Sequence, residues 1–344
     1  MKYRLLISLL FLAWLLLPSC FKEIDTVPIP RTVDKTFTVQ YSIRKIQSFH
    51  RFYENTVLEV DTAISTGWDL AFESAGEGNR VLIGWSSYAT AVKTGKYDFS
   101  EISQELILDL IEHSQEWAFD DPSYVNIPDS LTLKDWEDGE IYIQNRGIEN
   151  DAYYALQFIS RTEDSCTFRY ASALWLDEPR ESTVYLNDGF NYVYFSYSRN
   201  TTLLVEPLRS TWDIVCTPYR GWWETSTAGV YAPFNLSGIL INNEFGVRIA
   251  HVFDPQITFG DIDLSFIHQY EFTDMKGAIG SNWKILGAVG SSNLYTMDPD
   301  KKYLMKKYDQ ETDRVMYFKL QIVDYKLNGE DHYPTIEFKF LGPE

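Results

Sequence analysis

The chain has 344 residues, of which 49 are acidic and 30 are lysine or arginine, so its formal net charge at pH 7 is −19. A surface this acidic argues against a nucleic-acid-binding protein and against one held to anionic lipid headgroups by charge. Aromatic residues make up 16% of the chain, and many stand in alternating runs that are typical of β-strands.

The first twenty residues have the pattern of a bacterial export signal. Lys2 and Arg4 precede an apolar run at 5–17 that is too short for a membrane-spanning helix. The run ends in Leu17-Pro18-Ser19-Cys20, which resembles the lipobox of bacterial lipoproteins. That resemblance implies cleavage before Cys20 and transfer of a diacylglycerol, with its fatty acyl chains, to the Cys20 thiol. The alternative is an ordinary secretory signal with an incidental cysteine.

We therefore predict a signal peptide at 1–19 and an extended tether at 20–35, which contains Pro28 and Pro30. Phe21-Lys22-Glu23 also resembles, over a very short stretch, the surface-export signal of Bacteroides-type lipoproteins. Removal of Lys2 and Arg4 with the signal lowers the net charge to −21. Acyl chains, and not charge, would hold such a protein at the membrane.

A tryptophan-aspartate stretch occurs twice in the chain. Thr66-Gly67-Trp68-Asp69-Leu70-Ala71-Phe72 returns as Ser210-Thr211-Trp212-Asp213-Ile214-Val215-Cys216. The two-residue period of a strand predicts that Trp68 shares a buried face with Leu70 and Phe72, and that Trp212 shares one with Ile214 and Cys216. The same period predicts that Asp69 and Asp213 point the other way, to solvent or to a local backbone donor.

Further landmarks follow each copy in the same order. The best match is between Tyr153-Tyr154-Ala155-Leu156-Gln157-Phe158 and Tyr317-Phe318-Lys319-Leu320-Gln321-Ile322, each followed by a closing strand. We interpret this order as a tandem duplication, with one β domain at 36–178 and a second at 179–344. The alternative is two unrelated all-β domains with coincidental motifs.

The pattern predicts an all-β fold with one short helix in the first domain. Ser100 can cap a helix that runs to Glu116, because Ile102, Leu106, Leu110 and Ile111 trace an apolar face. The corresponding stretch at 261–272 has weaker helical spacing and is either helix or loop. Cys166 and Cys216 alternate with apolar neighbours, which favours buried thiols over a bridge between the two copies.

The sequence contains no recognisable catalytic motif. A nucleophile elbow, a phosphate-binding loop, a dinucleotide fingerprint and a paired-cysteine motif are all missing, and the five histidines lack the close spacing of metal ligands. Asp69 and Asp213 are counterparts in two copies, so nothing places them across one cleft as a hydrolytic pair. We therefore predict a binding protein and not an enzyme.

Adjacent indoles mark a candidate binding surface in the second copy. Trp222 and Trp223 lie in the part that carries the extra length of that copy, and in extended chain they point to opposite sides. One of them is then expected to escape the core and to stack on a sugar, a porphyrin or another protein. The alternative is that both are absorbed between strand and loop.

Taken together, the Trp68-Asp69-Leu70-Ala71-Phe72 strand, the later tryptophan and the Tyr-x-x-Leu-Gln strand resemble the HmuY-like lipoproteins, once per copy from about Lys35 onward. That resemblance implies an all-β protein at the outer membrane or cell surface that binds haem and passes it to a TonB-dependent receptor. The family holds the iron through two histidines or two methionines. The type member's axial histidine position is Gly287-Ala288 here, and the first copy has no histidine or methionine between Trp117 and Tyr142.

The second copy keeps three candidate haem ligands, namely Met297 beyond Trp283, and Met275 or His268 before it. These residues are also of types that fill cores and surfaces. The resemblance thus predicts a lipid-anchored protein that captures an apolar or planar ligand, with haem as the implied cofactor. The alternative is an accessory lipoprotein that has lost haem ligation and binds a glycan or a protein.

Overall fold

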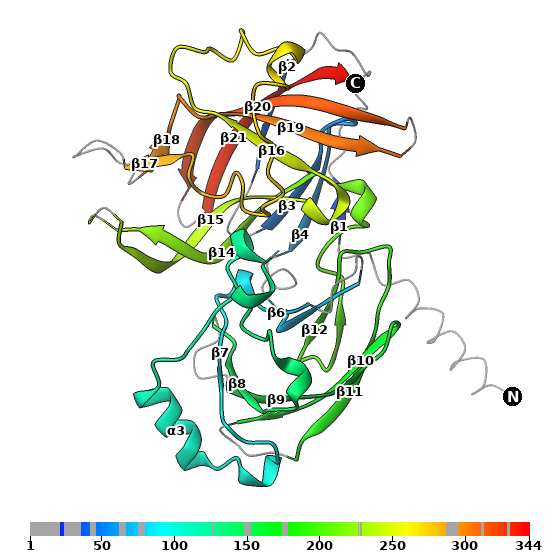
Figure 1. Cartoon of the computed structure of the whole chain (residues 1–344), viewed down its shortest axis with the longest axis vertical. Coiled ribbons are helices and arrows are strands. Elements are labelled where there is room, and N and C mark those ends of the chain that lie inside the picture. The colour runs from blue at the N-terminus through cyan, green and yellow to red at the C-terminus, as the bar shows by residue number, and fades with distance from the viewer. Residues whose placement is uncertain are drawn as a thin grey trace, which may run out of the picture.

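The computed structural model describes residues 21–23, 36–41, 46–61, 67–74, 80–125, 127–147, 153–173, 178–225, 227, 229–286, 295–310, 313–328 and 331–344. These residues form mainly antiparallel strands, so the predicted all-β class is confirmed (Figure 1). Cys20 lies outside the described residues, and its lipidation stays a prediction. No helix in the described ranges is long and apolar enough to cross a membrane.

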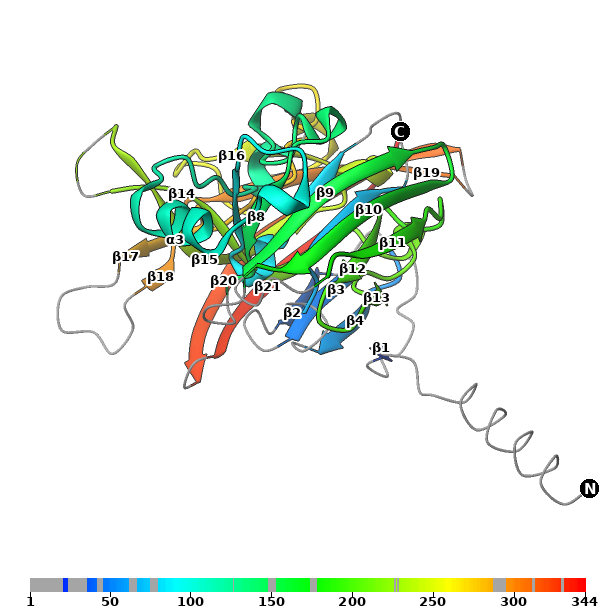
Figure 2. The same ribbon diagram turned by 90° about the horizontal axis from the view of Figure 1, so that it is seen from below.

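One packed unit, which we call the inserted unit, contains strands β5 to β13. Its larger sheet has the order β11-β10-β9-β8-β7, and its smaller sheet has the order β13-β12-β5-β6. In the larger sheet, β9, β10 and β11 run side by side (Figure 2). The strands are β5 (Leu70–Glu73), β6 (Val81–Ile83), β7 (Thr90–Lys93), β8 (Tyr142–Asn145), β9 (Tyr153–Arg161), β10 (Ser165–Ser172), β11 (Arg180–Tyr185), β12 (Tyr192–Ser196) and β13 (Thr201–Leu203).

The second unit, the outer unit, combines strands from both ends of the chain. Its sheets have the orders β16-β19-β20-β21-β2 and β1-β4-β3-β14-β15, and a β17–β18 hairpin stands apart. The strands are β1 (Phe21–Glu23), β2 (Thr36–Gln40), β3 (Ile46–Arg51), β4 (Thr56–Asp61), β14 (Ile214–Glu224), β15 (Tyr231–Ile241), β16 (Arg248–Val252), β17 (Lys284–Leu286), β18 (Tyr295–Met297), β19 (Lys302–Asp309), β20 (Arg314–Asn328) and β21 (Asp331–Pro343).

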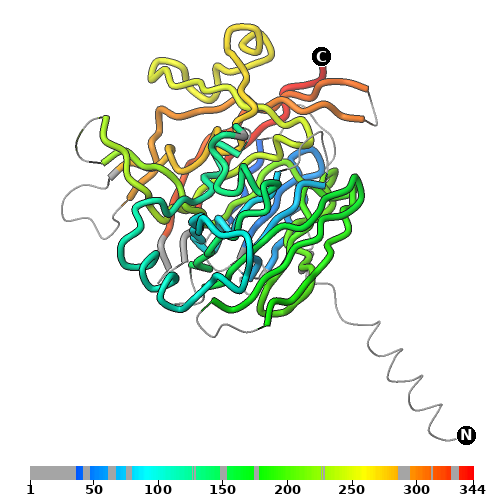
Figure 3. The backbone as a smooth tube through the Cα atoms, turned by 60° about the horizontal axis from the view of Figure 1, so that its bottom comes forward, coloured from blue at the N-terminus to red at the C-terminus, as the bar shows by residue number. Residues whose placement is uncertain are grey.

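The strands of the two units pair in the same order, but each unit contains strands from both halves of the chain. Strands β2–β4 of the first half belong to the outer unit and β11–β13 of the second half belong to the inserted unit, and we call these six the exchanged strands. In the outer unit, β2 pairs with β21 and β3 pairs with β14. In the inserted unit, β11 pairs with β10 and β12 pairs with β5. The blue N-terminal strands therefore lie between the green and the orange parts of the chain (Figure 3). The strand pairings thus cross the predicted boundary between 36–178 and 179–344.

A second, shorter sequence repeat accompanies this pairing order. Asn55-Thr56-Val57-Leu58-Glu59-Val60 in the outer unit matches Asn200-Thr201-Thr202-Leu203-Leu204-Val205 in the inserted unit. The two asparagines precede β4 and β13 and have φ angles of 51° and 50°. Asparagine tolerates this left-handed conformation better than most residues. The matched turns make β4 and β13 equivalent strands.

Three of the five hydrophobic clusters among the described residues hold the facing sheets and the two units together. One fills the inserted unit around Phe72 and Phe168, and one fills the outer unit around Trp283 and Phe318. The third lies between the units and contains both repeated indoles, Trp68 and Trp212, each 1% exposed.

The prediction that each indole shares a face with the strand that follows is therefore wrong. Leu70 and Ile214 belong to the cores of their own units, whereas Trp68 and Trp212 enter the cluster between the units. Both tryptophans precede the first paired residue of their strand, β5 or β14, so the two-residue alternation of a strand does not apply to them.

The repeated aspartates also lie elsewhere than predicted, because both are buried ion-pair partners. Asp69 Oδ1 lies 2.5 Å from Arg146 Nε, and Asp213 Oδ1 lies 2.5 Å from Lys307 Nζ. The second oxygen of each accepts a backbone N–H, from Tyr197 at 2.6 Å and from Phe52 at 2.8 Å. Burying a charge is tolerated only with such partners, so these carboxylates fix the exchanged strands in place.

The predicted helix exists but is shorter. Helix α3 spans Gln104–His113, and Ser103, not Ser100, caps it by accepting the N–H of Leu106 at 3.2 Å. Ser100 lies instead in a 3-10 turn that Asp98 caps. The stretch 261–272 contains only a short 3-10 turn, at Leu264–Phe266. The 3-10 turns are Trp85–Ser87, Phe99–Glu101, Pro122–Tyr124, Pro128–Ser130, Trp136–Asp138, Arg209–Thr211, Asn243–Phe245 and Leu264–Phe266.

The two cysteines among the described residues, Cys166 and Cys216, are buried and unbridged. Cys166 faces the core of the inserted unit and Cys216 the core of the outer unit. The prediction of buried thiols is therefore confirmed. Burial raises the pKa of the Cys166 thiol to about 12 and also raises that of Cys216, so both remain protonated and unreactive at neutral pH.

Candidate functional site

A projecting hairpin carries the exposed aromatic residues. Strand β14 pairs with β3 only through Ile214–Cys216, whereas it pairs with β15 along its whole length to Glu224. The outer parts of β14 and β15 thus form a two-stranded arm, which lies on the same side of the outer unit as the β17–β18 hairpin (Figure 1). Trp222, Tyr231 and Phe234 on the arm are 47%, 59% and 45% exposed.

The inserted unit holds this arm in position. Asp121 Oδ2 accepts the N–H of Trp222 at 2.8 Å, and the Phe119 ring lies 5.3 Å from the Trp222 ring. The Arg220 guanidinium lies 5.1 Å from the centre of the Phe119 ring and donates to the Tyr88 carbonyl at 3.3 Å. A two-stranded ribbon is marginal by itself, so these contacts keep the aromatic side chains at fixed positions.

A groove of about 650 Å³ lies between the arm and the inserted unit, and we call it the junction groove. Its base includes Tyr219, whose hydroxyl donates to Ser281 Oγ at 3.3 Å. Two glycines allow the walls to meet closely. A Cβ on Gly277 would lie 2.1 Å from Ser123 Oγ, and a Cβ on Gly238 would lie 2.4 Å from the Gly280 carbonyl oxygen.

The polar groups of the junction groove are mostly engaged with the protein. Lys284 is buried, donates to Ser237 Oγ at 2.9 Å and lies over the Trp283 ring at 4.9 Å. His251 Nε2 lies 2.6 Å from the Ala278 carbonyl oxygen, and its ring stacks on Phe253. Burial lowers the pKa of His251, so its imidazole is neutral at pH 7.

Comparisons with protein-family models, with curated proteins and with solved structures each found no match.

The structure brings three of the predicted site residues to the junction groove. Trp222, Trp223 and Met275 line it. Trp222 is exposed and Trp223 is half-buried, so one indole does leave the core, as predicted. Their cross-strand partners are Pro233 and Ala232, which places the two indoles on opposite faces of the arm.

The other two predicted residues lie outside the groove lining. Met297 is on β18, opposite Lys284, and is half-buried against the core of the outer unit. His268 is on the surface, where its Nε2 lies 3.3 Å from Glu344 Oε1 and its side chain is 73% exposed. Residues 287–294, which join β17 to β18, are not among the described residues.

The described residues therefore do not fit the predicted haem ligation. Axial coordination needs two side chains that face the iron from opposite sides, and only Met275 of the three candidates lines the groove. His251 also lines it, but its Nε2 already bonds the Ala278 carbonyl. Nor do the described ranges contain a cluster of three or more histidine, cysteine or acidic side chains that could hold a metal ion.

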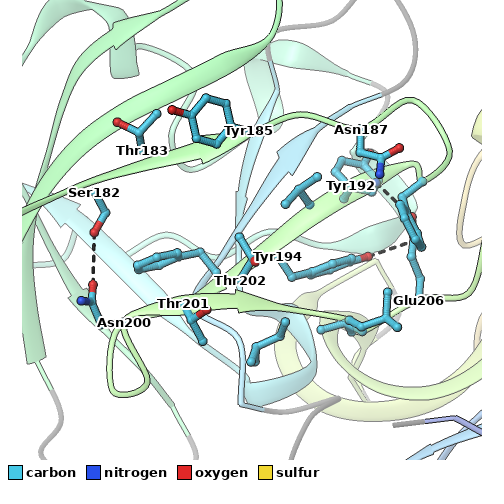
Figure 4. A pocket seen from close by; sticks show the side chains of 16 residues that line it. Ser182, Thr183, Tyr185, Asn187, Tyr192, Tyr194, Asn200, Thr201, Thr202 and Glu206 are labelled. Atoms are coloured by element: carbon cyan, nitrogen blue, oxygen red, sulfur yellow. Dashed lines mark hydrogen bonds between the residues drawn. The ribbon is translucent and has the colours of Figure 1, made fainter. Parts of the chain in front are cut away.

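A second hollow lies at the open mouth of the inserted unit, between β11 and β13 (Figure 4). This mouth groove has a volume of about 590 Å³, and hydroxyl groups of Thr183, Tyr185 and Thr202 are among its polar groups. Glu206 lies at its inner end and is 3% exposed. No sequence motif described above indicates this groove, although the repeated Asn-Thr-x-Leu-x-Val pattern marks one of its edges.

Proposed function

We propose that this protein is a lipid-anchored component of the bacterial cell envelope that captures a neutral saccharide in the junction groove. One observation supports the proposal most directly. The arm presents Trp222 and Tyr231 to solvent, while Asp121 and Phe119 of the other unit fix its position. Exposed aromatic rings held rigidly beside a hollow are typical of binding surfaces.

The groove has the mixed chemistry that sugar rings require. Its volume of about 650 Å³ falls within the usual range for small-ligand sites. The indole and phenol faces can cover the C–H face of a sugar, and Glu224, Asn282 and Thr273 in the lining can bond its hydroxyls. The acidic net charge repels polyanionic glycans at long range, which favours a neutral ligand.

We propose a saccharide and not haem as the ligand, because the described residues that line the groove do not provide a pair of axial ligands for the iron. The anchor on Cys20 and the position at the outer membrane or cell surface rest on the sequence pattern. Delivery of the captured ligand to a TonB-dependent receptor is part of the same proposal and rests on the resemblance to HmuY-like lipoproteins. We assign no catalytic role to the groove.

Glycan-array screening of the purified mature chain, followed by calorimetric titration of the best ligand, tests the proposal. Trp222→Ala is expected to weaken binding at least about tenfold, which corresponds to about 1.4 kcal/mol. Tyr97→Ala is the matched control, because Tyr97 is an aromatic residue of the inserted unit that is 59% exposed and does not line the groove.

The same preparation is titrated with hemin. Absence of any glycan ligand, or equal losses in Trp222→Ala and Tyr97→Ala, contradicts saccharide capture in this groove. A saturable Soret shift that Met275→Ala abolishes would restore haem as the ligand and overturn the saccharide proposal.

A further inference from the structure

The mouth groove of the inserted unit is bordered by two sheet edges. Strand β11 ends the larger sheet and β13 ends the smaller one, and side chains from both line the groove (Figure 4). Asn200 fixes one end of it, because Asn200 Oδ1 accepts the Tyr170 hydroxyl at 2.6 Å and the Ser182 hydroxyl at 3.1 Å. These hydrogen bonds fix the separation of the two sheet edges at this end of the groove.

The edge formed by β13 is short, at three residues, but carries none of the other usual protections of an edge strand. No described strand pairs with the outer side of β13, and Thr201-Thr202-Leu203-Leu204-Val205 contains no charge, proline or glycine. Leu204, which lines the groove, is 41% exposed. Natural proteins normally protect such edges with lysine, proline, bulges or a covering segment. An uncovered edge of this composition is a template for another strand.

The equivalent edge of the outer unit is covered. Strand β4 pairs with β3 on one side and with β1 on the other, with Glu23 opposite Leu58 and Phe21 opposite Val60. By the Asn-Thr-x-Leu-x-Val match, Leu58 and Val60 correspond to Leu203 and Val205. The fold thus already contains an extended segment that pairs antiparallel with one of two equivalent edges.

Among the described residues, no strand of the inserted unit takes the place that β1 has in the outer unit. The segment that precedes its first exchanged strand, β11, is the connection from β10, which ends at Ser172, to Arg180. Strands β10 and β11 pair with each other, so neither of them covers β13.

We propose that the mouth groove accepts an extended segment of a partner polypeptide, of the type that β1 provides, which pairs antiparallel with Leu203–Val205. The main chain supplies the pairing, and alternate side chains of the segment enter the groove. Hydroxyl and apolar groups dominate its lining, with Glu206 at the inner end and no lysine or arginine. The groove therefore favours small, hydroxylated or apolar side chains at the positions that enter it. This site is independent of the junction groove.

An acetylated and amidated peptide with the sequence of residues 21–27, Phe-Lys-Glu-Ile-Asp-Thr-Val, is the probe. Hydrogen exchange of the mature full chain, followed by mass spectrometry, is expected to slow at Leu203–Val205 as the peptide saturates. The same peptide N-methylated at its central residues is expected to give no protection, because its main-chain donors are blocked.

Two matched variants locate the peptide. Leu204→Lys places a charge on the edge and is expected to weaken peptide binding at least about tenfold. Leu208→Lys makes the same change at a residue that is 51% exposed and does not line the groove, so it is expected to bind as the parent does. Trp222→Ala is also expected to bind the peptide normally, which separates this proposal from saccharide capture.

Three outcomes overturn the proposal. The first is no protection of Leu203–Val205 at millimolar peptide, and the second is protection confined to Leu58–Val60, which would mean replacement of β1 on its own edge. The third is protection of the mouth groove by a saccharide with no response to the peptide, which would make it a second glycan site.

Discussion

Glu206 makes the stability of the protein depend on pH in a way that one substitution can isolate. Its Oε1 accepts the N–H of Asn191 at 2.5 Å and of Tyr192 at 3.0 Å, and its Oε2 accepts the Tyr194 hydroxyl at 3.3 Å. Burial raises the pKa of this carboxyl to about 7, against the opposing effects of the backbone donors and of the Lys276 ammonium.

The sign and size of the effect follow from linkage. Between the ordinary pKa of 4.5 and the folded-state pKa of about 7, the folded protein keeps a proton on Glu206 that the unfolded chain has lost. The stabilisation that this proton gives is fully present below about pH 4.5 and is lost as the pH rises through about 7. The difference between the two pKa values corresponds to a loss of about 3 kcal/mol.

Glu206→Gln removes the titration while it keeps the hydrogen bonds. The amide oxygen can accept both backbone N–H groups, and the amide nitrogen can donate to the Tyr194 oxygen. The variant is expected to match the parent near pH 4.5 and to be more stable by about 3 kcal/mol near pH 8.5. His50, whose pKa burial lowers to about 4, and Asp120, whose pKa burial raises to about 6, titrate equally in both proteins and cancel in the difference.

Urea unfolding followed by tryptophan fluorescence and circular dichroism measures this difference at several pH values. Glu181→Gln, at an exposed position, serves as the control and is expected to show no such trend. A difference between Glu206→Gln and the parent that stays constant from about pH 4.5 to 8.5 would refute the reasoning. So would a variant that loses stability as the pH rises, because the carboxylate would then be stabilised by Lys276 and not penalised by burial.

Two other substitutions test an ion pair inside the outer unit and the close contact between the units. Asp213→Ala leaves the Lys307 ammonium buried without its carboxylate and the Phe52 N–H without an acceptor, and it is expected to lower the free energy of unfolding by about 3–5 kcal/mol. The double variant with Lys307→Met should lose distinctly less, and equal losses in urea titrations would contradict a buried ion pair. Gly277→Ala forces a Cβ to within 2.9 Å of Ser123 Cα and is expected to cost about 1–3 kcal/mol. Gly260→Ala, which meets only Thr258 Oγ1 at 3.5 Å, should unfold like the parent, and equal effects of the two would argue against close packing at the junction.

Local sequence patterns were sufficient for the class of the fold and for the one α-helix among the described residues. Alternation of β-branched and aromatic residues depends on the chain itself, as does the apolar face of α3, so both could be predicted. Exposure of one of the two indoles, Trp222 or Trp223, could also be predicted, because adjacent residues of a strand point to opposite sides. The start of α3 could not be fixed, since Ser100 and Ser103 are both adequate caps and only Ser103 is used.

Local patterns could not predict the exchange of strands or the buried ion pairs. Arg146 and Lys307 are separated from Asp69 and Asp213 by 77 and 94 residues, and no local period connects residues so far apart. Strand β3 pairs with β14 and not with the equivalent β5, a choice between two strands with nearly the same sequence pattern. Met297 and His268 do not line the predicted site, because their positions depend on tertiary packing and not on spacing along the chain.

The pairing of β2 with β21 has a consequence for how the chain reaches its native state. Thr36 lies opposite Lys339, so β2, near the start of the chain, can form this pairing only after β21, near its end, has been made. Such distant contacts slow folding, because the intervening chain loses entropy before the contact forms. The inserted unit can assemble early and β3 can pair with β4, whereas β2 stays unpaired until β21 is made. A nascent chain stalled before residue 331 is therefore expected to expose β2 and one edge of β20, both of which pair with β21 in the folded protein, and to be prone to aggregation.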